Sequence, residues 1–310
     1  MLKNLLMIEK IKNIFEPHEI CSIIVTFKST HKSLSNIIKK HQDNFHQVII
    51  VNNSPEINLS QFQSKQVMLI NNPNNTGLAA ALNKGILEAK KLEFKMVALF
   101  DQDTELPLNF TQKMLHYMNN YSDDKPVAVF SPVFYNHVIN EPSRHINFKS
   151  FRLIRRTVSK TEDYAHPHYV ITSGSMIPIK VLDEVGLMRE ELFIDFLDIE
   201  WCIRARKQGF EIVAFNKVMI NHYLGDYAVH FMGHRYAIHS PLRIYYYFRN
   251  AMYLYRLRGI DWNWKFVDAA RNPFRFLFYM LFVKNRPTYF KYIIKGYYHG
   301  LIKKMGKLEE

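Results

Sequence analysis

The sequence predicts an α/β protein whose first half folds as a parallel sheet with helices packed against it. Short apolar runs alternate with segments of helical periodicity, which is typical of parallel strands joined by right-handed crossovers. The run from Met96 to Phe100 is continuously apolar, as a strand buried on both faces would be. The expected strands cover residues 21–27, 47–51, 66–70 and 96–100, and the expected helices cover residues 33–40 and 78–91.

The second half, from about Ser131, has its own pattern of strand and helix. Asp198 is expected to open one helix as an acidic N-cap, and Gly209 to stop it. The pair His166 and His168 flanks a proline and is expected in a loop. The expected elements here are a helix at 180–185, a helix at 198–208 and a strand at 210–215.

The composition favours a large core in a reducing compartment. The chain has 310 residues, 48% of them hydrophobic, and two cysteines, which are too few for a disulfide framework. Residues 1–16 are expected to form a short amphipathic helix, and its charges interrupt the apolar run that a signal peptide needs. The longest apolar candidate, residues 276–283, is far shorter than the roughly 20 residues of a membrane-spanning helix.

Positive charge is concentrated at the C-terminal end. The net charge is +13, and residues 241–310 hold 14 Lys/Arg against 4 Asp/Glu together with 19 of the 44 aromatic residues. Such a region suggests an anionic partner, either nucleic acid or lipid. Two or three helices are expected, which could lie in a membrane interface with their cations snorkelling past apolar rings. The alternative is an ordinary helical subdomain packed on the core, and both can hold together.

Two carboxylates follow the buried strand directly, in the segment Phe100-Asp101-Gln102-Asp103-Thr104. Ligands of open α/β sheets bind at the carboxyl ends of strands, and hard divalent cations take oxygen ligands together with substrate phosphates. The pair is therefore a candidate anchor for a metal–diphosphate group, and the alternative is two solvated turn aspartates. The sequence has no G-x-G-x-x-G and no Walker-type loop, so NAD, FAD and P-loop chemistry lose support.

Further motifs follow one another along the chain in a fixed order. They are Ser22-Ile23-Ile24-Val25-Thr26-Phe27, Val51-Asn52-Asn53-Ser54, Asn74-Asn75-Thr76-Gly77 with the helix to Gly85, Asp101-Gln102-Asp103, Ser173-Gly174-Ser175, Phe193-Ile194-Asp195-Phe196-Leu197-Asp198-Ile199-Glu200-Trp201, His222-Tyr223-Leu224-Gly225, and Tyr245-Tyr246-Tyr247-Phe248-Arg249-Asn250. Together they resemble glycosyltransferase family 2, the inverting enzymes of GT-A fold. Within that family the chain is similar to the bacterial rhamnosyltransferases that build O-antigen and related glycans.

The resemblance implies a nucleotide-diphospho-sugar transferase with a Rossmann-like mixed sheet flanked by helices. The domain division expected from it is an N-terminal amphipathic segment at 1–18, a nucleotide-sugar-binding half at 19–130, an acceptor-binding and catalytic half at 131–239, and a helical, membrane-associating region at 240–310.

The resemblance also assigns the donor side of the site. Asp103 would coordinate Mg²⁺ or Mn²⁺, Asp101 would contact the ribose or the metal shell, and His222 would complete a mixed oxygen and nitrogen ligand set. For a lone histidine the alternative is a hydrogen-bonded core residue. The other residues expected to contact the donor are Thr26, Asn52, Asn53, Asn75, Asn83, Gln102, Gly174 and Arg249.

Asn52 departs from the family pattern, because many relatives carry Asp at this position and use it to contact the base of the nucleotide. An amide offers a different donor and acceptor pattern to a pyrimidine edge. For Asn75 and Asn83 the alternative role is capping of a loop and a helix. For Gly174 the absence of a side chain would let the donor sugar approach the backbone.

On the acceptor side the resemblance makes Asp198 the general base. The alternative is a plain helix cap, worth about 1 kcal/mol. Asp195 and Glu200 are expected near the acceptor, but on a helix Glu200 would point about 200° away from Asp198, so its role would be acceptor orientation or structure. Trp201 would line the acceptor site or pack in the core.

The resemblance thus implies transfer of L-rhamnose from dTDP-L-rhamnose to a lipid-linked glycan, by a peripheral protein on the cytoplasmic face of a bacterial plasma membrane. The nearest rival is a family 2 enzyme with another donor, such as a galactofuranosyl or N-acetylhexosaminyl nucleotide. A protein that binds nucleic acid through its basic tail is a second rival, but the tail lacks an RNA-module signature and no nucleic acid is expected. A catalytically inert scaffold is a third, against which the set Asp101, Asp103, Asp198 and His222 argues.

Overall fold

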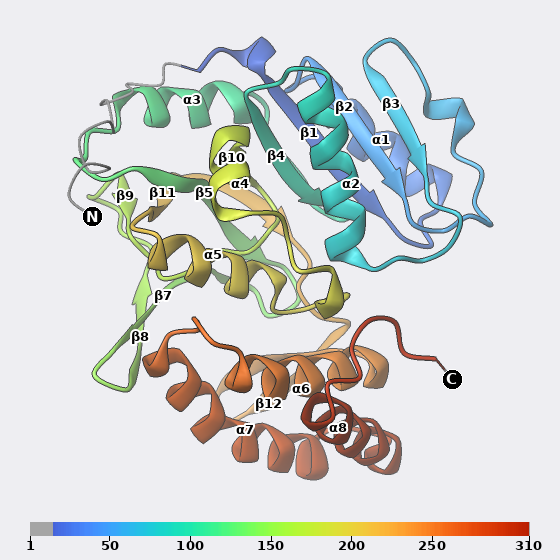
Figure 1. Ribbon diagram of the computed structural model, residues 1–310, viewed down its shortest axis with the longest axis vertical. Coiled ribbons are helices and arrows are strands. Elements are labelled where there is room, and N and C mark those ends of the chain that lie inside the picture. Colours follow the sequence, from blue (N-terminus) through green and yellow to red (C-terminus); the bar gives the residue numbers. More distant parts are fainter. Residues whose placement is uncertain (1–14, 310) are drawn as a thin grey trace.

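The computed structural model describes residues 15–309, so the helix expected at residues 1–16 lies almost wholly outside the described residues. A nine-stranded mixed sheet forms the centre of the molecule (Figure 1). Its strands are β1 (Ile20–Thr26), β2 (Gln47–Asn52), β3 (Val67–Asn71), β4 (Met96–Asp101), β5 (Val127–Asn136), β6 (Glu141–Pro142), β9 (Tyr164–Ala165), β10 (Ser175–Pro178) and β11 (Glu211–His222).

The order of the strands explains where a ligand would bind. It runs β3-β2-β1-β4-β10-β5-β11-β9, with β6 paired to β5. The first four strands are parallel, as predicted, whereas β10 runs antiparallel between β4 and β5, and β11 is parallel to β5. The ends of β4 and β11 therefore come out at the same edge of the sheet, which is the edge where open α/β sheets bind ligands.

Helices cover both faces of this sheet, which accounts for its unbroken apolar strands. Alternate residues of β1 point to opposite sides: Ile23 and Val25 pack with α2, α4 and α5, while Ile20 and Ile24 pack with α1 and α3. The helices of this part are α1 (His31–Gln42), α2 (Leu78–Lys91), α3 (Phe110–Asn120), α4 (Ile179–Val185) and α5 (Leu197–Lys207), with 3-10 turns at Pro17–Glu19, Ser60–Phe62 and Glu190–Leu192.

Two predictions about the second half are corrected. The helix α5 begins at Leu197 with Phe196 as N-cap in the left-handed region, so Asp198 is the second helical residue rather than the cap. The strand expected at 210–215 continues to His222 as β11, past an irregularity between Phe215 and Met219. This continuation brings His222 to the edge of the sheet.

Two hairpins were not predicted. They are β7 (Arg144–Lys149) with β8 (Arg152–Thr157), and β12 (Tyr227–Phe231) with β13 (His234–Ile238). Both are mostly half-buried or exposed and rich in arginine, histidine and other polar residues, so they lack the apolar alternation from which a strand is recognised.

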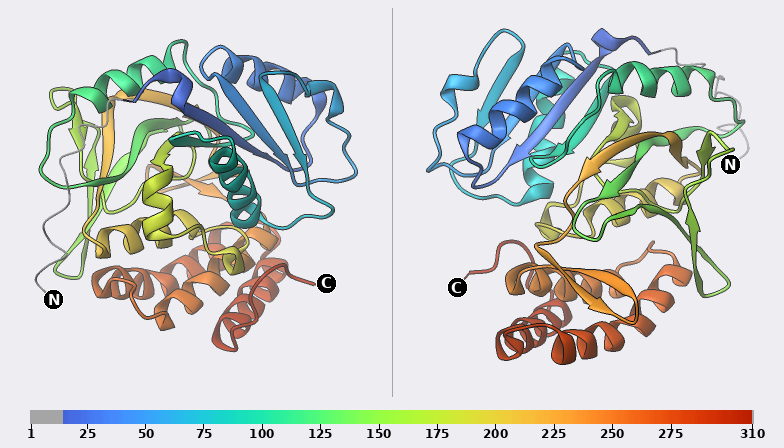
Figure 2. Two further views of the ribbon diagram at one scale, coloured as in Figure 1. Left: turned by 45° about the horizontal axis from the view of Figure 1, so that its top comes forward. Right: turned by 180° about the vertical axis from the view of Figure 1, so that it is seen from behind.

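Three helices, as expected, form a separate layer below the sheet in Figures 1 and 2: α6 (Pro241–Arg256), α7 (Trp262–Phe282) and α8 (Arg286–Leu301). The helices α6 and α8 pack closely because Gly296 and Gly300 face α6. A Cβ on these glycines would lie 2.6 Å from the carbonyl oxygen of Tyr245 and 2.5 Å from that of Arg249, respectively. Among the described residues, no helix has the length and apolar content needed to cross a bilayer.

Candidate active site

The predicted metal ligands come together at the edge of the sheet. Asp101 is the last residue of β4, Asp103 lies in the turn that follows, and His222 ends β11. One ligand atom from each lies within 4.8 Å of the others. The strands β4 and β11 are not neighbours in the sheet. However, the backbones of Glu105, which follows β4, and Asn221, in β11, exchange two hydrogen bonds of 3.0 and 3.1 Å, which bring the ends of the two strands together.

Each carboxylate faces one nitrogen of the imidazole. Nε2 of His222 lies 3.6 Å from Oδ2 of Asp101, and Nδ1 lies 3.3 Å from Oδ1 of Asp103. Burial alone would lower the pKa of His222, but Asp103 and Asp101 outweigh it and raise that pKa. The Nδ1 atom is buried and makes no aligned hydrogen bond among the described residues. A buried imidazole between two carboxylates fits a divalent cation such as Mg²⁺ or Mn²⁺.

Asp101 is the carboxylate at the centre of this group. Burial raises its pKa, His222 opposes that rise, and Asp103 adds to it. Its side chain keeps 31% of its surface exposed, so one side of the carboxylate still faces open space. A half-buried carboxylate with one open side suits a cation that arrives with its own phosphate ligands.

The turn that carries Asp103 is held by the hydroxyl group of Ser173, in the loop that precedes β10. Ser173 makes a short hydrogen bond to Thr104, and its Oγ accepts a hydrogen bond of 3.4 Å from the backbone nitrogen of Asp101. Gly174 follows with a φ of +84°, and a Cβ there would lie 2.6 Å from Pro132. The packing against Pro132 accounts for this glycine, and close approach of a sugar remains a prediction.

Gln102 holds the end of β1 rather than pointing away from it. Its Oε1 accepts a hydrogen bond of 2.6 Å from the backbone nitrogen of Phe27, and its Nε2 donates one of 3.0 Å to the carbonyl oxygen of the same residue. Thr26, just before, has a buried Oγ1 with no hydrogen-bond partner among the described residues. Both residues lie at the ligand-binding edge, and a role in donor binding remains a prediction for each.

A network of asparagines follows β2 and β3. The amide nitrogen of Asn52 donates to Ile57 O at 2.8 Å and Asn71 Oδ1 at 3.0 Å, and its Oδ1 accepts from Ser54 N at 3.1 Å. Asn52 is only 2% exposed, so these bonds use the amide that was expected to read the base. The structure supports a scaffolding role for Asn52 instead.

Asn53 and Asn75 extend this network to the turn at Gly77. The Nδ2 of Asn53 donates to Asn75 Oδ1 at 3.0 Å and to Gly77 O at 3.2 Å, and Asn75 Oδ1 also accepts from Gly77 N. Asn53 is 3% exposed, so it shapes the turn from within. Asn75 is half-buried and remains within reach of a ligand at the surface of the turn.

Asp198 lies near the carboxylates of Asp195 and Asp101. Burial raises the pKa of Asp198 to about 6, the backbone amide of Ile199 opposes this, and the charges of Asp195 and Asp101 add to it. The Ile199 nitrogen lies 2.8 Å from Oδ1 of Asp198. The first turn of α5 and the end of β4 thus direct their acidic groups into one region, and the expected general base is one of them.

A cation that the sequence did not single out lies in the same region. Arg243, in the first turn of α6, donates its Nε to Oδ1 of Asp195 at 3.1 Å. Asp195 raises the pKa of this guanidinium most, burial opposes the rise, and Asp101 adds to it. Only the Ser-Pro start of a helix at residues 240–241 could have signalled that Arg243 occupies a helix N-terminus.

The loop before α5 has an unusual backbone. Phe193, Asp195 and Phe196 all have φ values between 63° and 65°, a region that non-glycine residues avoid. Each such residue costs roughly 1–3 kcal/mol, and clusters of them occur at functional sites. The carbonyl oxygen of Phe193 accepts hydrogen bonds from Leu78 N at 2.7 Å and Ala79 N at 3.3 Å, which fixes this loop to the start of α2.

Gly77 makes that contact possible. A Cβ at Gly77 would lie 2.5 Å from the ring of Phe193, and its φ of +88° also favours glycine. The turn before α2 and the loop before α5 therefore touch directly.

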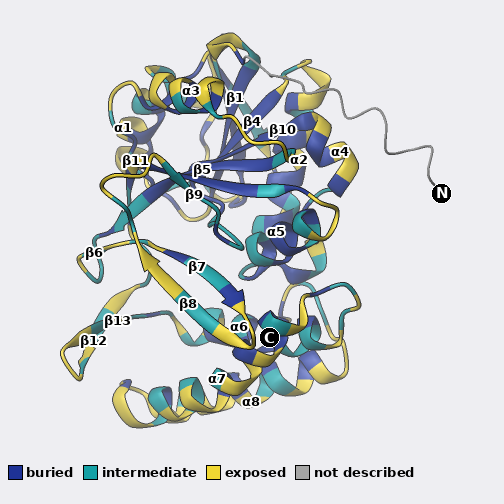
Figure 3. Cartoon of the chain, turned by 90° about the vertical axis from the view of Figure 1, so that its left-hand side faces the viewer, coloured by how far each residue is buried: buried dark blue, intermediate teal, exposed yellow. Residues whose placement is uncertain are grey.

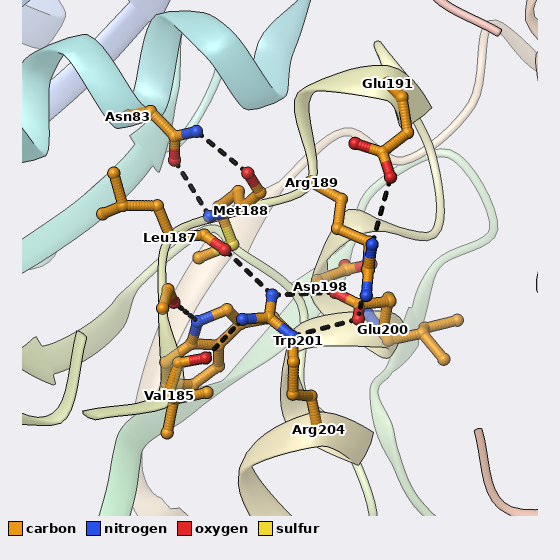
Figure 4. Close-up of polar contacts among 12 residues, drawn as sticks. Asn83, Val185, Leu187, Met188, Arg189, Glu191, Asp198, Glu200, Trp201 and Arg204 are labelled. Atoms are coloured by element: carbon orange, nitrogen blue, oxygen red, sulfur yellow. Dashed lines mark hydrogen bonds and ion pairs between the residues drawn. The ribbon is translucent and has the colours of Figure 1, made fainter. Parts of the chain in front are cut away.

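Figure 4 shows why three predicted ligand-binding residues are scaffolding residues instead. Glu200 is 1% exposed and pairs with Arg189 at 2.7 Å and Arg204 at 2.9 Å. Trp201 is 1% exposed and donates its Nε1 to Gly186 O at 2.8 Å, so the core alternative holds for it.

Asn83, on α2, is the third. It donates to Met188 O and accepts from Met188 N, each at 2.9 Å, and is 2% exposed. All three side chains hold the segment between α4 and α5 in place. Their polar groups are used in these contacts within the described part of the chain, and none is left to contact a sugar donor or a glycan acceptor.

Arg249 is a further correction, because it was expected to face phosphates. Its guanidinium is 0% exposed and donates to the carbonyl oxygens of Leu192 at 2.9 Å, Glu191 at 3.3 Å and Gly306. Its carbon Cζ lies 4.8 Å from the ring centre of Tyr246. Arg249 thus supports the strained loop that precedes α5, and it does not reach the ligand-binding edge.

Comparison with known sequences identifies relatives of this chain. The sequence profile described as "Glycosyl transferase family 2" matches residues 22–186. The chain is 32% identical over 241 residues to the dTDP-rhamnosyl transferase RfbF of Shigella flexneri, covering 76% of this chain and 80% of that protein. It is 24% identical over 203 residues to the low-salt glycan biosynthesis hexosyltransferase Agl10 of Haloferax volcanii, covering 61% of this chain and 62% of that protein.

Solved structures are similar in fold. A crystal structure of S. aureus TarS 1-349 has a TM-score of 0.53 at 14% identity and covers 92% of this chain and 81% of that one. The crystal structure of GalNAc-T7 with UDP, GalNAc and Mn²⁺ also has a TM-score of 0.53, at 13% identity, and covers 82% of this chain and 54% of that one. The mixed sheet flanked by helices is thus the GT-A fold that the motifs implied.

Proposed function

Because the chain belongs to glycosyl transferase family 2, we propose that it transfers L-rhamnose from dTDP-β-L-rhamnose to a hydroxyl group of a cell-surface glycan, with inversion at the sugar. The observation that supports dTDP-L-rhamnose as the donor is the 32% identity to a dTDP-rhamnosyl transferase across most of both chains. The acceptor we propose is a lipid-linked O-antigen or another surface polysaccharide, and the enzyme would act as a peripheral protein on the cytoplasmic face of a bacterial plasma membrane.

The departing nucleotide diphosphate needs its charge neutralised. Asp101, Asp103 and His222 would hold Mg²⁺ or Mn²⁺, which supplies that positive charge when it is bound. The Nδ1 of His222 supports this proposal, because it is buried 3.3 Å from Asp103 without an aligned hydrogen bond among the described residues, and a bound cation would satisfy both groups.

Arg243, and not Arg249 as expected, is the arginine that we place at the phosphates. Its Nε is used by Asp195, and its charge lies within electrostatic reach of Asp101. A guanidinium has further N–H groups in a planar fork, which suits a phosphate. We assign Arg243 to the phosphates of the donor and Asp195 to its orientation.

Asp198 is the proposed general base for the acceptor hydroxyl. A base is most effective when its pKa lies near the working pH, and burial raises the pKa of Asp198 to about 6. The amide of Ile199 holds one carboxylate oxygen, which leaves the other to take the proton. Inversion follows if the hydroxyl attacks from the side opposite the diphosphate, in line with the bond that breaks.

Another nucleotide sugar is a second candidate for the donor, because the chain is also 24% identical to a hexosyltransferase. The experiment is to incubate the protein with a panel of nucleotide sugars, with Mg²⁺, Mn²⁺ or a chelator, and to measure released nucleotide diphosphate. We expect release from dTDP-L-rhamnose only, and only with a cation. Faster release from a galactofuranosyl or N-acetylhexosaminyl nucleotide would move the proposal to that donor.

A variant pair tests the metal group in the same assay. Asp103→Ala should abolish cation-dependent binding of the donor and leave the thermal melt in place, because Asp103 is 41% exposed at the edge of the sheet. Asp183→Ala, which removes a surface ion pair with Lys90, is the matched control and should bind the donor normally. Equal cation-dependent binding by Asp103→Ala and wild type would remove Asp103 from the site.

A further inference from the structure

The helix α7 is amphipathic with its apolar side turned outward. Five of its exposed large side chains are separated by four, eight, three and four residues, which are spacings that place them along one side of the helix. Trp262 and Phe274 are each 72% exposed. The stripe consists of Trp262, Phe266, Phe274, Leu277 and Leu281.

The charged residues of α7 face the protein instead. Asp268 is 6% exposed and accepts hydrogen bonds from Arg275 at 2.7 Å and from Tyr255 of α6 at 2.6 Å. Lys265 is 8% exposed and donates to Leu257 O at 2.8 Å. A surface helix of a soluble protein has the opposite arrangement, and a contiguous exposed apolar surface marks an interaction site.

The apolar stripe continues beyond α7 at both ends. On α8, Phe290 and Ile294 are 49% and 46% exposed, and the ring of Phe290 lies 6.1 Å from that of Phe276 on α7. At the other end, Phe151 in the turn between β7 and β8 is 55% exposed, with its ring 5.2 Å from that of Phe266. Figures 2 and 3 show α7 and α8 as the outermost layer, on the side away from the central sheet.

The border of this surface is basic. Residues 262–308 contain ten Lys/Arg and a single acidic residue, Asp268, which is buried and paired with Arg275. Lys284, in the turn between α7 and α8, and Arg286, the first residue of α8, are exposed, as are Lys291 and the pair Lys303 and Lys304. The exposed acids next to this segment are Asp261 before α7 and Glu309 after α8, and the exposed cations between them outnumber these acids, which matches an anionic partner.

We propose that the outward apolar stripe of α7, with Phe290 and Ile294, docks on an anionic lipid bilayer with α7 lying in the plane of the interface. This α7–α8 face would sink about 5–10 Å into the boundary between headgroups and acyl chains, while the basic border contacts the headgroups. The charge pattern favours lipid over a second copy of the chain, because two such basic borders would repel each other. The inference deepens the proposed lipid-linked acceptor, but the docking itself does not depend on which sugar is transferred.

Cosedimentation of the full-length protein with vesicles tests this. Wild type should bind vesicles of phosphatidylcholine with phosphatidylglycerol more than tenfold better than vesicles of phosphatidylcholine alone. Raised salt should release only part of the bound protein, because salt does not screen the insertion of apolar side chains. Phe274→Ser/Leu277→Ser should lower binding at least tenfold, and Lys284→Glu/Arg286→Glu should remove the preference for anionic vesicles.

Leu87→Ser/Leu108→Ser is the matched control, because both leucines are exposed, at 47% and 75%, and belong to the sheet half of the molecule. It should bind vesicles like wild type. Each variant is also tested for binding of dTDP with Mn²⁺, which should be unchanged. This readout separates loss of docking from failure of the proposed donor site or loss of folding.

Three results would overturn the proposal. One is wild-type protein that stays in the supernatant with anionic vesicles at low salt. Another is equal vesicle binding by wild type and Phe274→Ser/Leu277→Ser. The third is a wild-type dimer in solution that the same double variant converts to monomer without any change in vesicle binding, which would make the face an interface between copies.

Discussion

Arg243 donates its Nε to Oδ1 of Asp195 at 3.1 Å, and this bond joins the first turn of α6 to the loop that precedes Asp198. The helical layer and the sheet therefore meet at the site itself. A cation in that position can act on the phosphates of a donor while its carboxylate partner orients it.

Arg243→Met should weaken binding of dTDP about tenfold or more, because a hydrogen bond to a charged group contributes roughly 1.5–3 kcal/mol. Binding of thymidine, which has no phosphate, should not change. The measurement is titration calorimetry of both ligands in the presence of Mn²⁺. Equal weakening of thymidine and dTDP would show that Arg243 only supports the fold.

Asp198→Asn should lower the transfer rate about 10²–10⁴-fold with saturating donor and acceptor, the usual contribution of a general base. Donor binding should survive. The variant should also melt at a higher temperature than wild type at pH 8, since an ionised, partly buried carboxylate is replaced by a neutral amide. Asp195→Asn and Glu200→Gln are the comparisons, and a collapse of the rate confined to Asp195→Asn would move the base to that residue.

The pH dependence of kcat/KM should report the same residue. The carboxylate form is the base, so the rate should rise with pH through about 6 and level off above it. Asp195 is one of the charges that raise the pKa of Asp198, so Asp195→Asn should shift the rise to lower pH. A profile that is flat between pH 5 and 8 would contradict the assignment of Asp198.

Asn52→Asp should destabilise the protein by roughly 1–3 kcal/mol at neutral pH, because a carboxylate oxygen would replace the amide that donates to Ile57 O and Asn71 Oδ1. Protonation restores a donor, so part of the loss should be recovered below pH 5. Urea unfolding at pH 7.5 and pH 4.5 measures both effects. Asn58→Asp is the control, because within residues 15–309 the side chain of the exposed Asn58 uses its Oδ1 alone, to accept from Ser60 N.

Gly300→Ala should destabilise the protein although alanine is the better helix former. The gain in helix propensity is about 1 kcal/mol, whereas a Cβ 2.5 Å from the carbonyl oxygen of Arg249 forces α8 away from α6. Overpacking of this kind costs about 1–3 kcal/mol. Thermal unfolding should show a lower midpoint for Gly300→Ala and an unchanged or higher one for Lys291→Ala on the exposed side of α8. A midpoint for Gly300→Ala at or above that of wild type would contradict the close packing.

The sequence was most informative where local pattern decides structure. The helix α2 was predicted at its observed bounds, because its alanines, leucines and terminal lysines are consistent with a single helical face. Asp101 and Asp103 were located because they follow an apolar run that only a buried strand explains. His222 was within reach of the sheet edge because the strand before it returns there.

Contacts between residues far apart in the chain could not be predicted from the sequence. Arg243 and Arg249 are both in α6, six residues and about 240° apart, so they face different directions. Aromatic residues surround both, and nothing local tells which arginine faces the site. The left-handed backbone of Phe193 and Asp195 was equally hidden, since bonds from α2 and α6 impose it on residues that would not adopt it alone.

The contact between Arg249 and Gly306 has a consequence for how the protein is made. The carbonyl oxygen of Gly306 is one of the acceptors of the Arg249 guanidinium, and Gly306 N lies 2.9 Å from Glu191 O. Domains fold from the N-terminal side as a chain is synthesised. The sheet and its carboxylates can form early, but the loop before Asp198 gains its last supports only after residue 306 has left the ribosome. A nascent chain can thus form the sheet edge that carries Asp101 and Asp103 before the loop that precedes Asp198 is held in place.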